Sequence, residues 1–240
     1  MNTDEFIKKL KEMNIYVDEE IMKKFDIYME ELIEYNKHTN LTAIRDKDEI
    51  LLKHFFDSLM IEKYFDFSKV NTLLDIGTGA GFPGLILAIM HKNLKVTLLD
   101  SNNKKLKFLE LLTNKLNITN VEIVHDRAEE YIKTRREYYD VVTSRAVSDL
   151  QMLSELSIPF IKIGGYFIPL KGKIEDELKR SKKIIEVLGA SIESINTFEL
   201  ENTQALRNIL LIKKVKSTPL KYPRAYSKIK NDVEKSIKIK

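Results

Sequence analysis

The sequence predicts an α/β protein: a mainly parallel, doubly wound sheet preceded by a helical N-terminal extension. Two patterns lead to this fold class. From Thr72 onward, short apolar runs alternate with stretches of helical periodicity, which is typical of a parallel sheet covered by helices. Residues 3–63 show helical periodicity alone, because apolar side chains recur there at the spacing of one helical face. One such face contains Ile21, Phe25, Tyr28, Met29, Leu32 and Ile33.

Each expected element follows from the same two patterns. Asp46 followed by Glu49 resembles a capping box, so we expect a further helix to carry residues 53–59. Strands are expected at residues 72–76, 96–99, 121–124, 140–143 and 166–170. Helices are expected at residues 83–90, 104–116, 150–156 and 175–188. Residues 194–200 and 208–215 have no long helix between them and are expected to close the sheet as an antiparallel pair.

Composition restricts the chemistry that the chain can carry. With 240 residues, of which 43% are hydrophobic, the chain can bury a large core. No apolar run approaches the ~20 residues that span a membrane, and the acidic start lacks the basic region of a secretory signal, so we expect a cytoplasmic protein. The absence of cysteine excludes disulfides, iron–sulfur clusters and thiolate zinc sites. The four histidines show no metal-ligand spacing, so no metal is expected, and no obligate protein partner is evident.

Charge is spread unevenly along the chain. Residues 213–240 contain ten Lys/Arg and two acidic residues, a net charge of +8, whereas the first 212 residues carry a net charge of −4. A basic tail on an acidic body indicates a polyanionic partner. The alternative interpretation is a solvated, frayed terminus, since chain ends are commonly disordered.

The strongest local motif is an apolar strand that runs into a glycine loop and then a helix start, over residues 73–84. Glycine allows positive φ and lets the backbone approach a ligand closely, and Pro83 fits the first turn of a helix. Ligands of open α/β sheets bind at the carboxyl ends of the strands. We therefore expect a nucleotide-type cofactor over the loop. In a purely structural interpretation, the glycines form tight turns and Asp75 is a cap.

Glycine spacing alone does not identify the cofactor. Gly79, Gly81 and Gly84 satisfy the G-x-G-x-x-G pattern of dinucleotide-binding proteins. However, Asp75 and Gly77 extend the pattern to D-x-G-x-G-x-G. S-adenosylmethionine (SAM) has no pyrophosphate, but it has an ammonium group that Asp75 could help to hold, so the extended pattern favours SAM over NAD.

Two further positions agree with a nucleotide cofactor without identifying it. Asp100 ends the expected second strand and is placed to accept both ribose hydroxyls of either cofactor. Residues 125–129 follow the third strand, where SAM enzymes commonly contact adenine, although a charged cluster there is equally consistent with a solvated helix start.

The full set of motifs resembles the RsmG family, also called GidB, of 16S ribosomal RNA guanine-N7 methyltransferases. The matching pieces are Asn40-Leu41-Thr42, His54-Phe55-Phe56-Asp57-Ser58-Leu59, residues 75–84, Arg127-Ala128-Glu129, Ser144-Arg145-Ala146-Val147, Lys171-Gly172 and Tyr222-Pro223-Arg224. The resemblance implies a Rossmann-like SAM-dependent methyltransferase fold, SAM as cofactor, and 16S rRNA or the small ribosomal subunit as partner. It also implies three regions: a helical N-terminal extension (1–66), a SAM-binding methyltransferase domain (67–216) and a basic C-terminal tail (217–240).

The resemblance also implies which residues bind the cofactor. It places SAM at Gly77, Phe82, Ala128, Glu129 and Arg145, beside the Asp75, Gly79, Gly81 and Asp100 that the loop and the second strand supply. The chain departs from the family after Arg224, where many members continue with a glycine- and proline-containing segment and this sequence does not. The conformation of the tail is therefore left open.

Guanine N7 carries an unprotonated lone pair, so its methylation requires no general base and no catalytic residue is assigned with certainty. Pyrimidine C5 methylation uses a cysteine, which is absent, and exocyclic amine methylation usually shows an Asp/Asn-Pro-Pro-aromatic element where residues 144–147 stand. Arg145 is expected at the reaction centre. It could order the cofactor or bind guanine O6 or an RNA phosphate; the alternative is a structural salt bridge.

Five residues are candidates for contacting RNA: Asn40, His54, Asp57, Tyr222 and Arg224. His54 and Asp57 would share one helical face, either as a surface pair or with Asp57 accepting hydrogen bonds from the Watson–Crick edge of guanine. Phe82 or another aromatic ring could stack on an extruded base. In the tail, Arg224 and several lysines flank Tyr222 as candidate phosphate-binding cations. Three rival functions stay open: a SAM enzyme with another substrate, an NAD-dependent oxidoreductase, and a non-catalytic RNA-binding assembly factor.

Overall fold

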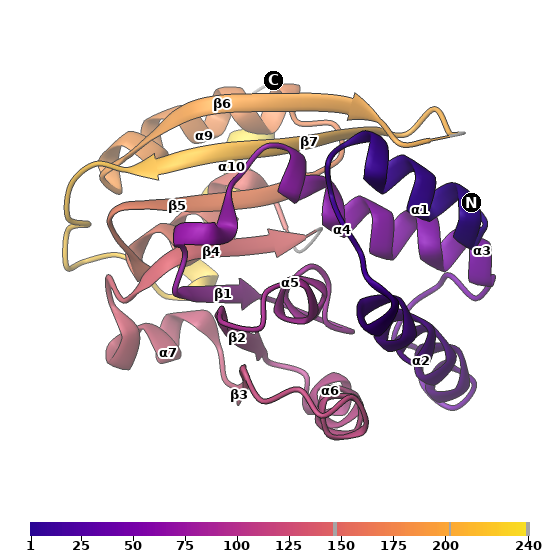
Figure 1. Ribbon diagram of the computed structural model, residues 1–240. Coiled ribbons are helices and arrows are strands. Elements are labelled where there is room, and N and C mark those ends of the chain that lie inside the picture. The colour runs from indigo at the N-terminus through magenta and orange to yellow at the C-terminus, as the bar shows by residue number, and fades with distance from the viewer. Residues whose placement is uncertain (146–147, 202, 239–240) are drawn as a thin grey trace. The chain divides into compact units, whose positions relative to one another are not determined.

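The computed structural model describes residues 1–145, 148–201 and 203–238. The chain divides into two compact units, whose helices and strands are labelled in Figure 1. Unit 1 contains Met1–His125 and Leu200–Gln204, and unit 2 contains Asp126–Glu199 and Ala205–Lys240. Among the described residues, no helix is long and apolar enough to cross a membrane, and no cluster of three or more His, Asp or Glu side chains could hold a metal ion.

The N-terminal part of unit 1 is helical, as the periodicity predicts. Its elements are α1 (Thr3–Glu12), α2 (Glu19–Asn36), α3 (Lys47–Ile50), a π-helical turn η1 (Leu51–Phe56), α4 (Asp57–Leu59) and two 3-10 turns, η2 (Met60–Lys63) and η3 (Phe67–Lys69). Asp46 caps α3 by accepting a hydrogen bond from the Glu49 N–H at 2.9 Å. The prediction of a regular helix over residues 53–59 is only partly correct, because a π-helical turn includes the first of these residues.

The sheet of unit 1 is parallel, with strand order β3-β2-β1. Its strands are β1 (Thr72–Ile76), β2 (Lys95–Asp100) and β3 (Val121–His125). The connecting helices are α5 (Gly84–Met90) and α6 (Asn103–Lys115). Strands and helices alternate because β1 and β2 are almost completely buried apolar runs, whereas α6 buries only one face.

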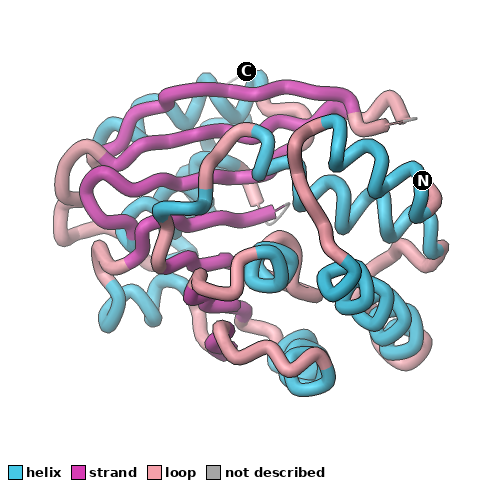
Figure 2. Tube along the Cα trace, in the orientation of Figure 1, coloured by secondary structure: helices cyan, strands magenta, loops and turns pink. Residues whose placement is uncertain are grey.

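Unit 2 continues the alternation of helices and strands (Figure 2) and closes with the antiparallel pair β6 and β7. In chain order it contains α7 (Ala128–Arg135), β4 (Tyr139–Arg145), α8 (Leu150–Ser157), the 3-10 turn η4 (Ile158–Phe160), β5 (Ile161–Lys171), α9 (Glu175–Val187), β6 (Ala190–Glu199), β7 (Leu206–Lys214) and α10 (Tyr226–Lys238). The strand order is β4-β5-β7-β6, in which β4 and β5 are parallel and β7 is antiparallel to both β5 and β6. The mainly parallel, doubly wound α/β fold is therefore confirmed.

The C-terminal tail is an integral part of unit 2. Helix α10 packs against α8 and buries Ile229 and Val233. Before α10, Thr218 is 4% exposed and donates its hydroxyl to the Leu188 carbonyl at 2.6 Å. The interpretation of the tail as a frayed terminus is wrong for residues 217–238, because these contacts give the segment a buried apolar face of its own.

Lys214, at the end of β7, is a completely buried lysine. Its ammonium group donates to the Ile158 carbonyl at 3.0 Å and to the Thr218 hydroxyl, and it lies 3.4 Å from Oε1 of Glu137. Burial lowers the pKa of Lys214 to about 8, against the partial compensation of the Glu137 carboxylate. The lysine therefore ties the end of β7 to the start of the tail, and it does so in an environment that disfavours its charge.

Lys214 should make the stability of unit 2 depend on pH. Its pKa is about 8 in the folded chain and 10.5 in the unfolded one, so the unfolded chain binds more protons between these values. The free energy of unfolding should thus rise as pH increases from about 8 to 10.5, by up to ~3 kcal/mol. Urea denaturation across this range should show the rise, and Lys214→Met should flatten it. The exposed Lys216→Met is the control; an equal effect of both substitutions would contradict the assignment.

Candidate functional site

The glycine loop of unit 1 lies between β1 and α5 and is fastened to the end of β2. The N–H groups of Gly77 and Thr78 both donate to the Leu99 carbonyl, at 2.8 and 3.1 Å. Gly77, Gly79 and Gly81 all have positive φ, at 68°, 61° and 103°. These conformations are unfavourable for residues with a Cβ, so the glycines are required by the backbone itself.

Asp75, near the end of β1, holds this loop by hydrogen bonds. It is completely buried, and its Oδ2 accepts hydrogen bonds from the Thr78 hydroxyl at 2.7 Å and from the Gly84 N–H at 2.9 Å. These bonds show that Asp75 positions the loop and the first turn of α5. That Asp75 helps to hold the ammonium group of SAM stays a prediction.

Asp100 links the end of β2 to the same loop. One carboxylate oxygen accepts the Gly79 N–H at 2.9 Å, and the other accepts the Asn102 N–H at 2.8 Å. An ionised carboxylate has about four acceptor positions, so both oxygens keep acceptor capacity for further donors. The arrangement fits the predicted ribose contact, and it adds a second role in fixing Gly79 that the sequence did not indicate.

The space around the glycines differs from one position to the next. A Cβ placed on Gly79 would meet nothing closer than 3.9 Å, whereas on Gly81 it would lie 2.5 Å from the Tyr28 hydroxyl and on Gly84 2.6 Å from a Leu98 methyl group. The backbone at Gly79 is therefore open on one side, while Gly81 and Gly84 are packed against the protein. This open, glycine-lined backbone beside the Asp100 carboxylate fits the adenosyl-type cofactor that the motif predicts.

The N-terminal helices of unit 1 support the loop, which the sequence did not reveal. The Tyr28 hydroxyl of α2 donates to the Ala80 carbonyl. The Phe82 ring is 5% exposed and stacks on Tyr28 with a centroid distance of 5.2 Å and on His54 at 4.8 Å. Phe82 is thus engaged with protein rings, so the prediction that it stacks on an extruded base is corrected. Tyr28 was predicted only as one member of an apolar helix face.

Asn40 lies in the loop after α2, and His54 of η1 contacts this loop through Thr42. Asn36, a buried residue, accepts the Leu41 and Thr42 N–H groups at 2.9 and 3.2 Å and donates to the Thr42 carbonyl. The Thr42 hydroxyl lies 2.8 Å from Nε2 of His54. Asn40 itself is exposed at the surface of this loop, so the structure leaves it accessible to a macromolecular substrate.

Asp57 does not fit the role that the sequence predicted. It is 5% exposed, although its backbone N–H still donates to the His54 carbonyl three residues earlier. A buried carboxylate in this position is closed to the Watson–Crick edge of a base. We therefore correct the prediction that His54 and Asp57 share one accessible helical face.

In unit 2, Ala128 and Glu129 form the first turn of α7. Ala128 is 8% exposed, and the Glu129 side chain is 14% exposed, with one oxygen 3.6 Å from the Arg127 guanidinium. Helix α7 follows the strand that ends at His125 in the chain. The structure thus confirms a helix start at the predicted adenine-binding segment, while a contact with adenine stays a prediction.

Arg145 is half-buried at the carboxyl end of β4, where its backbone pairs with Leu170 of β5. Ala146 and Val147, which complete the Ser144-Arg145-Ala146-Val147 motif, lie outside the described residues. The predicted position of Arg145 at the end of a strand is therefore correct, and its role at a reaction centre stays a proposal.

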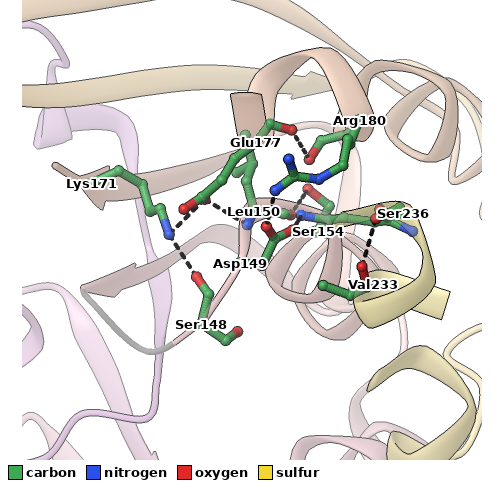
Figure 3. Close-up of polar contacts among 11 residues, drawn as sticks. Ser148, Asp149, Leu150, Ser154, Lys171, Glu177, Arg180, Val233 and Ser236 are labelled. Atoms are coloured by element: carbon green, nitrogen blue, oxygen red, sulfur yellow. Dashed lines mark hydrogen bonds and ion pairs between the residues drawn. The ribbon is translucent and has the colours of Figure 1, made fainter. Parts of the chain in front are cut away.

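Residues 148–150, at the start of α8, are held by charged side chains from β5 and α9 (Figure 3). Lys171 donates to the Ser148 carbonyl at 2.6 Å and pairs with Glu177 at 2.8 Å. Glu177 in turn accepts the Leu150 N–H at 2.8 Å. Asp149 caps α8 and pairs with Arg180 at 2.7 Å. The sequence indicated Lys171 only as a matching motif, whereas the structure shows that it fixes the start of α8.

Arg224 has an internal partner. Its guanidinium and its backbone N–H donate three hydrogen bonds to the carboxylate of Glu155, at 2.8 to 2.9 Å, and a fourth reaches Asp232 at 2.5 Å. Glu155 is completely buried, and both carboxylates raise the pKa of Arg224. The prediction of Arg224 as a phosphate-binding cation is corrected, because this geometry uses the guanidinium to neutralise a buried charge. Tyr222 is half-buried, and its carbonyl accepts a hydrogen bond from Arg136.

Comparison with proteins of known structure indicates the fold of this chain. Its fold is similar to that of a SAM-dependent methyltransferase from Aquifex aeolicus, with a TM-score of 0.52, 21% identity, and coverage of 70% of this chain and 94% of that one. It is also similar to M. jannaschii TYW2 in complex with AdoMet, with a TM-score of 0.53, 14% identity, and coverage of 66% and 77%. This chain therefore has the Rossmann-like α/β fold that these two proteins share.

Sequence comparison identifies the family within this class. The family model of GidB, rRNA small subunit methyltransferase G, matches residues 21–207. Ribosomal RNA small subunit methyltransferase G from a strain of Bacillus cereus is 45% identical over 227 residues, covering 93% of this chain and 95% of the relative. The protein of the same name from Bacillus thuringiensis (strain Al Hakam) gives the same identity and coverage. The chain belongs to the GidB family of SAM-dependent rRNA methyltransferases, and the resemblance predicted from its motifs is confirmed.

Proposed function

We propose that this protein transfers the methyl group of SAM to N7 of a guanine in the 16S rRNA of the small ribosomal subunit. Membership of the GidB family supports the class of reaction and of substrate. The observation that carries the choice of atom is the end of β4, where Ser144 and Arg145 stand in a chain that has no cysteine. An RNA substrate of this kind also implies a cytoplasmic protein.

Candidate contacts for SAM are proposed in each unit separately. In unit 1, the Asp100 carboxylate accepts hydrogen bonds from the ribose hydroxyls, and the backbone of Gly77 and Gly79 lies against the cofactor. In unit 2, the start of α7 at Ala128 and Glu129 supplies backbone and carboxylate contacts to adenine. SAM supplies an electrophilic methyl group on a sulfonium. Asp75 and Tyr28 support this site by holding the glycine loop in its conformation.

Catalysis rests on positioning. Guanine N7 presents its lone pair directly, so no side chain has to remove a proton. Holding the two reacting atoms in line can lower the barrier by ~7–11 kcal/mol. Arg145 orders this centre with its guanidinium, a planar group with five N–H donors. It does so by binding guanine O6, an RNA phosphate or the cofactor, and it leaves N7 open.

The function is tested by nucleoside mass spectrometry of 16S rRNA. RNA from a strain that lacks the gene should contain one 7-methylguanosine fewer than the parental RNA, and purified protein with SAM should restore it. An unchanged 7-methylguanosine content would refute the choice of N7, and loss of a different methylated nucleoside would identify another target. Methylation of isolated small subunits and of naked 16S rRNA, compared side by side, would show which form is the substrate.

The SAM site makes a prediction about affinity. Asp100→Ala removes the proposed ribose acceptor, and Gly77→Val fills the loop and strains a residue with φ of 68°. Both substitutions should raise the Kd for SAM at least tenfold, which corresponds to about 1.4 kcal/mol of binding free energy. Isothermal titration calorimetry measures this change. Asp46→Ala is the control, because it also removes a carboxylate that caps a backbone N–H but lies outside the loop. Unchanged affinity in both loop variants, with the fold intact, would refute the site.

The absence of a general base predicts a flat pH profile. When methyl transfer is rate-limiting in single-turnover experiments, the rate constant should be constant between about pH 6 and 9. A loss of activity below the usual pKa of histidine would contradict this prediction. It would then indicate that His54 takes part in the chemistry.

A further inference from the structure

Helix α10 presents a row of lysines on its exposed face. Lys228, Lys235 and Lys238, together with Asn231, follow the spacing i, i+7, i+10 and i+3 and are all exposed. The opposite face, with Ile229 and Val233, is buried against α8. We refer to Lys228, Lys235 and Lys238 as the lysine row. At a rise of ~1.5 Å per residue the row extends over about 15 Å.

The acidic residues of α10 do not neutralise the lysine row. Asp232 binds the Arg224 guanidinium at 2.5 Å, and Glu234 lies 3.8 Å from Lys230. Both carboxylates therefore face other cations of the same segment. In the described part of the chain, the three lysines of the row have no ion pair.

The helix is anchored at both ends, and this fixes the direction of the row. Arg224, just before α10, binds Glu155 in the second half of α8, whereas Ser236 in the last turn of α10 lies 3.4 Å from Gln151 at the start of α8. The two helices are thus antiparallel. The last turn of α10, with Lys235 and Lys238, lies beside the first turn of α8.

That first turn belongs to the same edge of unit 2 as Arg145. The parallel strands β4 and β5 end at Arg145 and Lys171, and Lys171 and Glu177 hold Ser148 and Leu150 at this edge (Figure 3). Ser236 of α10 appears in the same view. The lysine row therefore lies on the side of α10 that faces away from α8. It extends towards the edge of unit 2 at which β4 ends with Arg145.

We propose that the lysine row is an RNA-binding surface that holds the phosphates flanking the methylated guanine. A strand of a nucleic acid duplex carries one phosphate per ~3.4 Å of axis, so a 15 Å row of cations can meet several successive phosphates. The face of α10 with Ile229 and Val233 is buried, and its exposed large apolar side chains are Tyr226 and Ile237, which is less apolar surface than a membrane-interface helix presents. The buried Glu155 pair and the apolar contacts hold the helix itself in place, so only the lysine side chains have to be ordered on binding.

The inference rests on the proposed function and is tested separately from it. The variant K228Q/K235Q/K238Q removes the row while leaving the anchoring residues intact. Fluorescence anisotropy with transcribed 16S rRNA measures how log Kd depends on log salt concentration. The slope of this dependence should fall by about 2 in the variant, because each lost contact with a single-stranded phosphate contributes ~0.7. Affinity at 0.1 M salt should fall about tenfold or more. The KM for RNA should rise in parallel, while kcat and SAM affinity stay unchanged.

The control is K179Q/K182Q/K183Q, which removes three exposed lysines from α9 of the same unit. Its salt dependence and KM should stay close to those of the wild type. An equal effect of both triple variants, or no effect of the α10 variant on salt dependence and KM, would overturn the lysine row as an RNA site. The proposal would also be overturned if the α10 variant still bound rRNA but lost its binding to an acidic protein. If the wild-type protein neither binds SAM nor methylates 16S rRNA, the proposed function fails instead.

Discussion

Arg224→Ala should destabilise unit 2 by about 3 kcal/mol, close to the lower end of the ~3–5 kcal/mol range for breaking a buried ion pair. The substitution removes the guanidinium that neutralises Glu155, a completely buried carboxylate. The lower end is expected because the Arg224 N–H would still bind Glu155 Oε1. Urea denaturation followed by circular dichroism measures the loss. SAM affinity at temperatures where the variant is folded should not change.

A double variant separates the buried charge from other effects. In E155L/R224M both charged groups are replaced by apolar side chains of similar volume, so no unpaired charge is left in the interior. Asp232 loses a partner but is 44% exposed and stays hydrated. Stability should return to within about 1 kcal/mol of the wild type. If Arg224→Ala leaves stability unchanged and instead flattens the salt dependence of RNA binding, Arg224 is a phosphate ligand after all.

Gly81→Ala should destabilise unit 1 by roughly 2–5 kcal/mol, because backbone strain and overpacking act together. The new Cβ would lie 2.5 Å from the Tyr28 hydroxyl and 3.0 Å from atoms of Leu85 and Leu109, on a residue with φ of 103°. Thermal and urea denaturation should both show the loss. The effect reports how tightly α2 packs on the glycine loop.

Two variants test this explanation. Tyr28→Phe removes the hydroxyl and its bond to Ala80, and alone should cost about 1 kcal/mol. The double variant Y28F/G81A should lose less stability than the two single losses added together. Gly79→Ala is the matched glycine control. Its Cβ would make only ordinary van der Waals contacts, none closer than 3.9 Å, so it should cost only the ~1–2 kcal/mol of a left-handed residue while weakening SAM binding. Equal stability losses in Gly79→Ala and Gly81→Ala would contradict the packing argument.

The tail changes how RNA binding has to be tested. Deleting all residues after Val215 would remove Thr218, Arg224 and α10 together, which would leave Glu155 unpaired and expose the apolar surface under Ile229. Such a truncation would measure the stability of unit 2 as much as its affinity for RNA. Substituting exposed lysines one face at a time avoids this confusion, since surface charges contribute little to stability.

The sequence by itself determined the features that depend on local chemistry. The alternation of apolar runs with helical stretches predicted every strand and its order along the chain, because the periods of burial are set by backbone geometry. The glycine loop was predicted because Gly77, Gly79 and Gly81 adopt a φ that other residues avoid. Asp100 and Arg145 were placed at strand ends for the same local reason, and the set of motifs identified the family.

Only the tertiary structure decided which polar residues are open to a ligand and which act inside the fold. Asp75, Asp57 and Arg224 look alike in sequence as candidate contacts, yet Asp75 and Asp57 are buried and Arg224 neutralises Glu155. Burial and pairing are set by residues far apart in the chain, such as Arg224 and Glu155, which are 69 positions apart, and no local pattern encodes such contacts. For the same reason the sequence showed that the tail is basic, while the packing of α10 on α8 decided which of its lysines face outward.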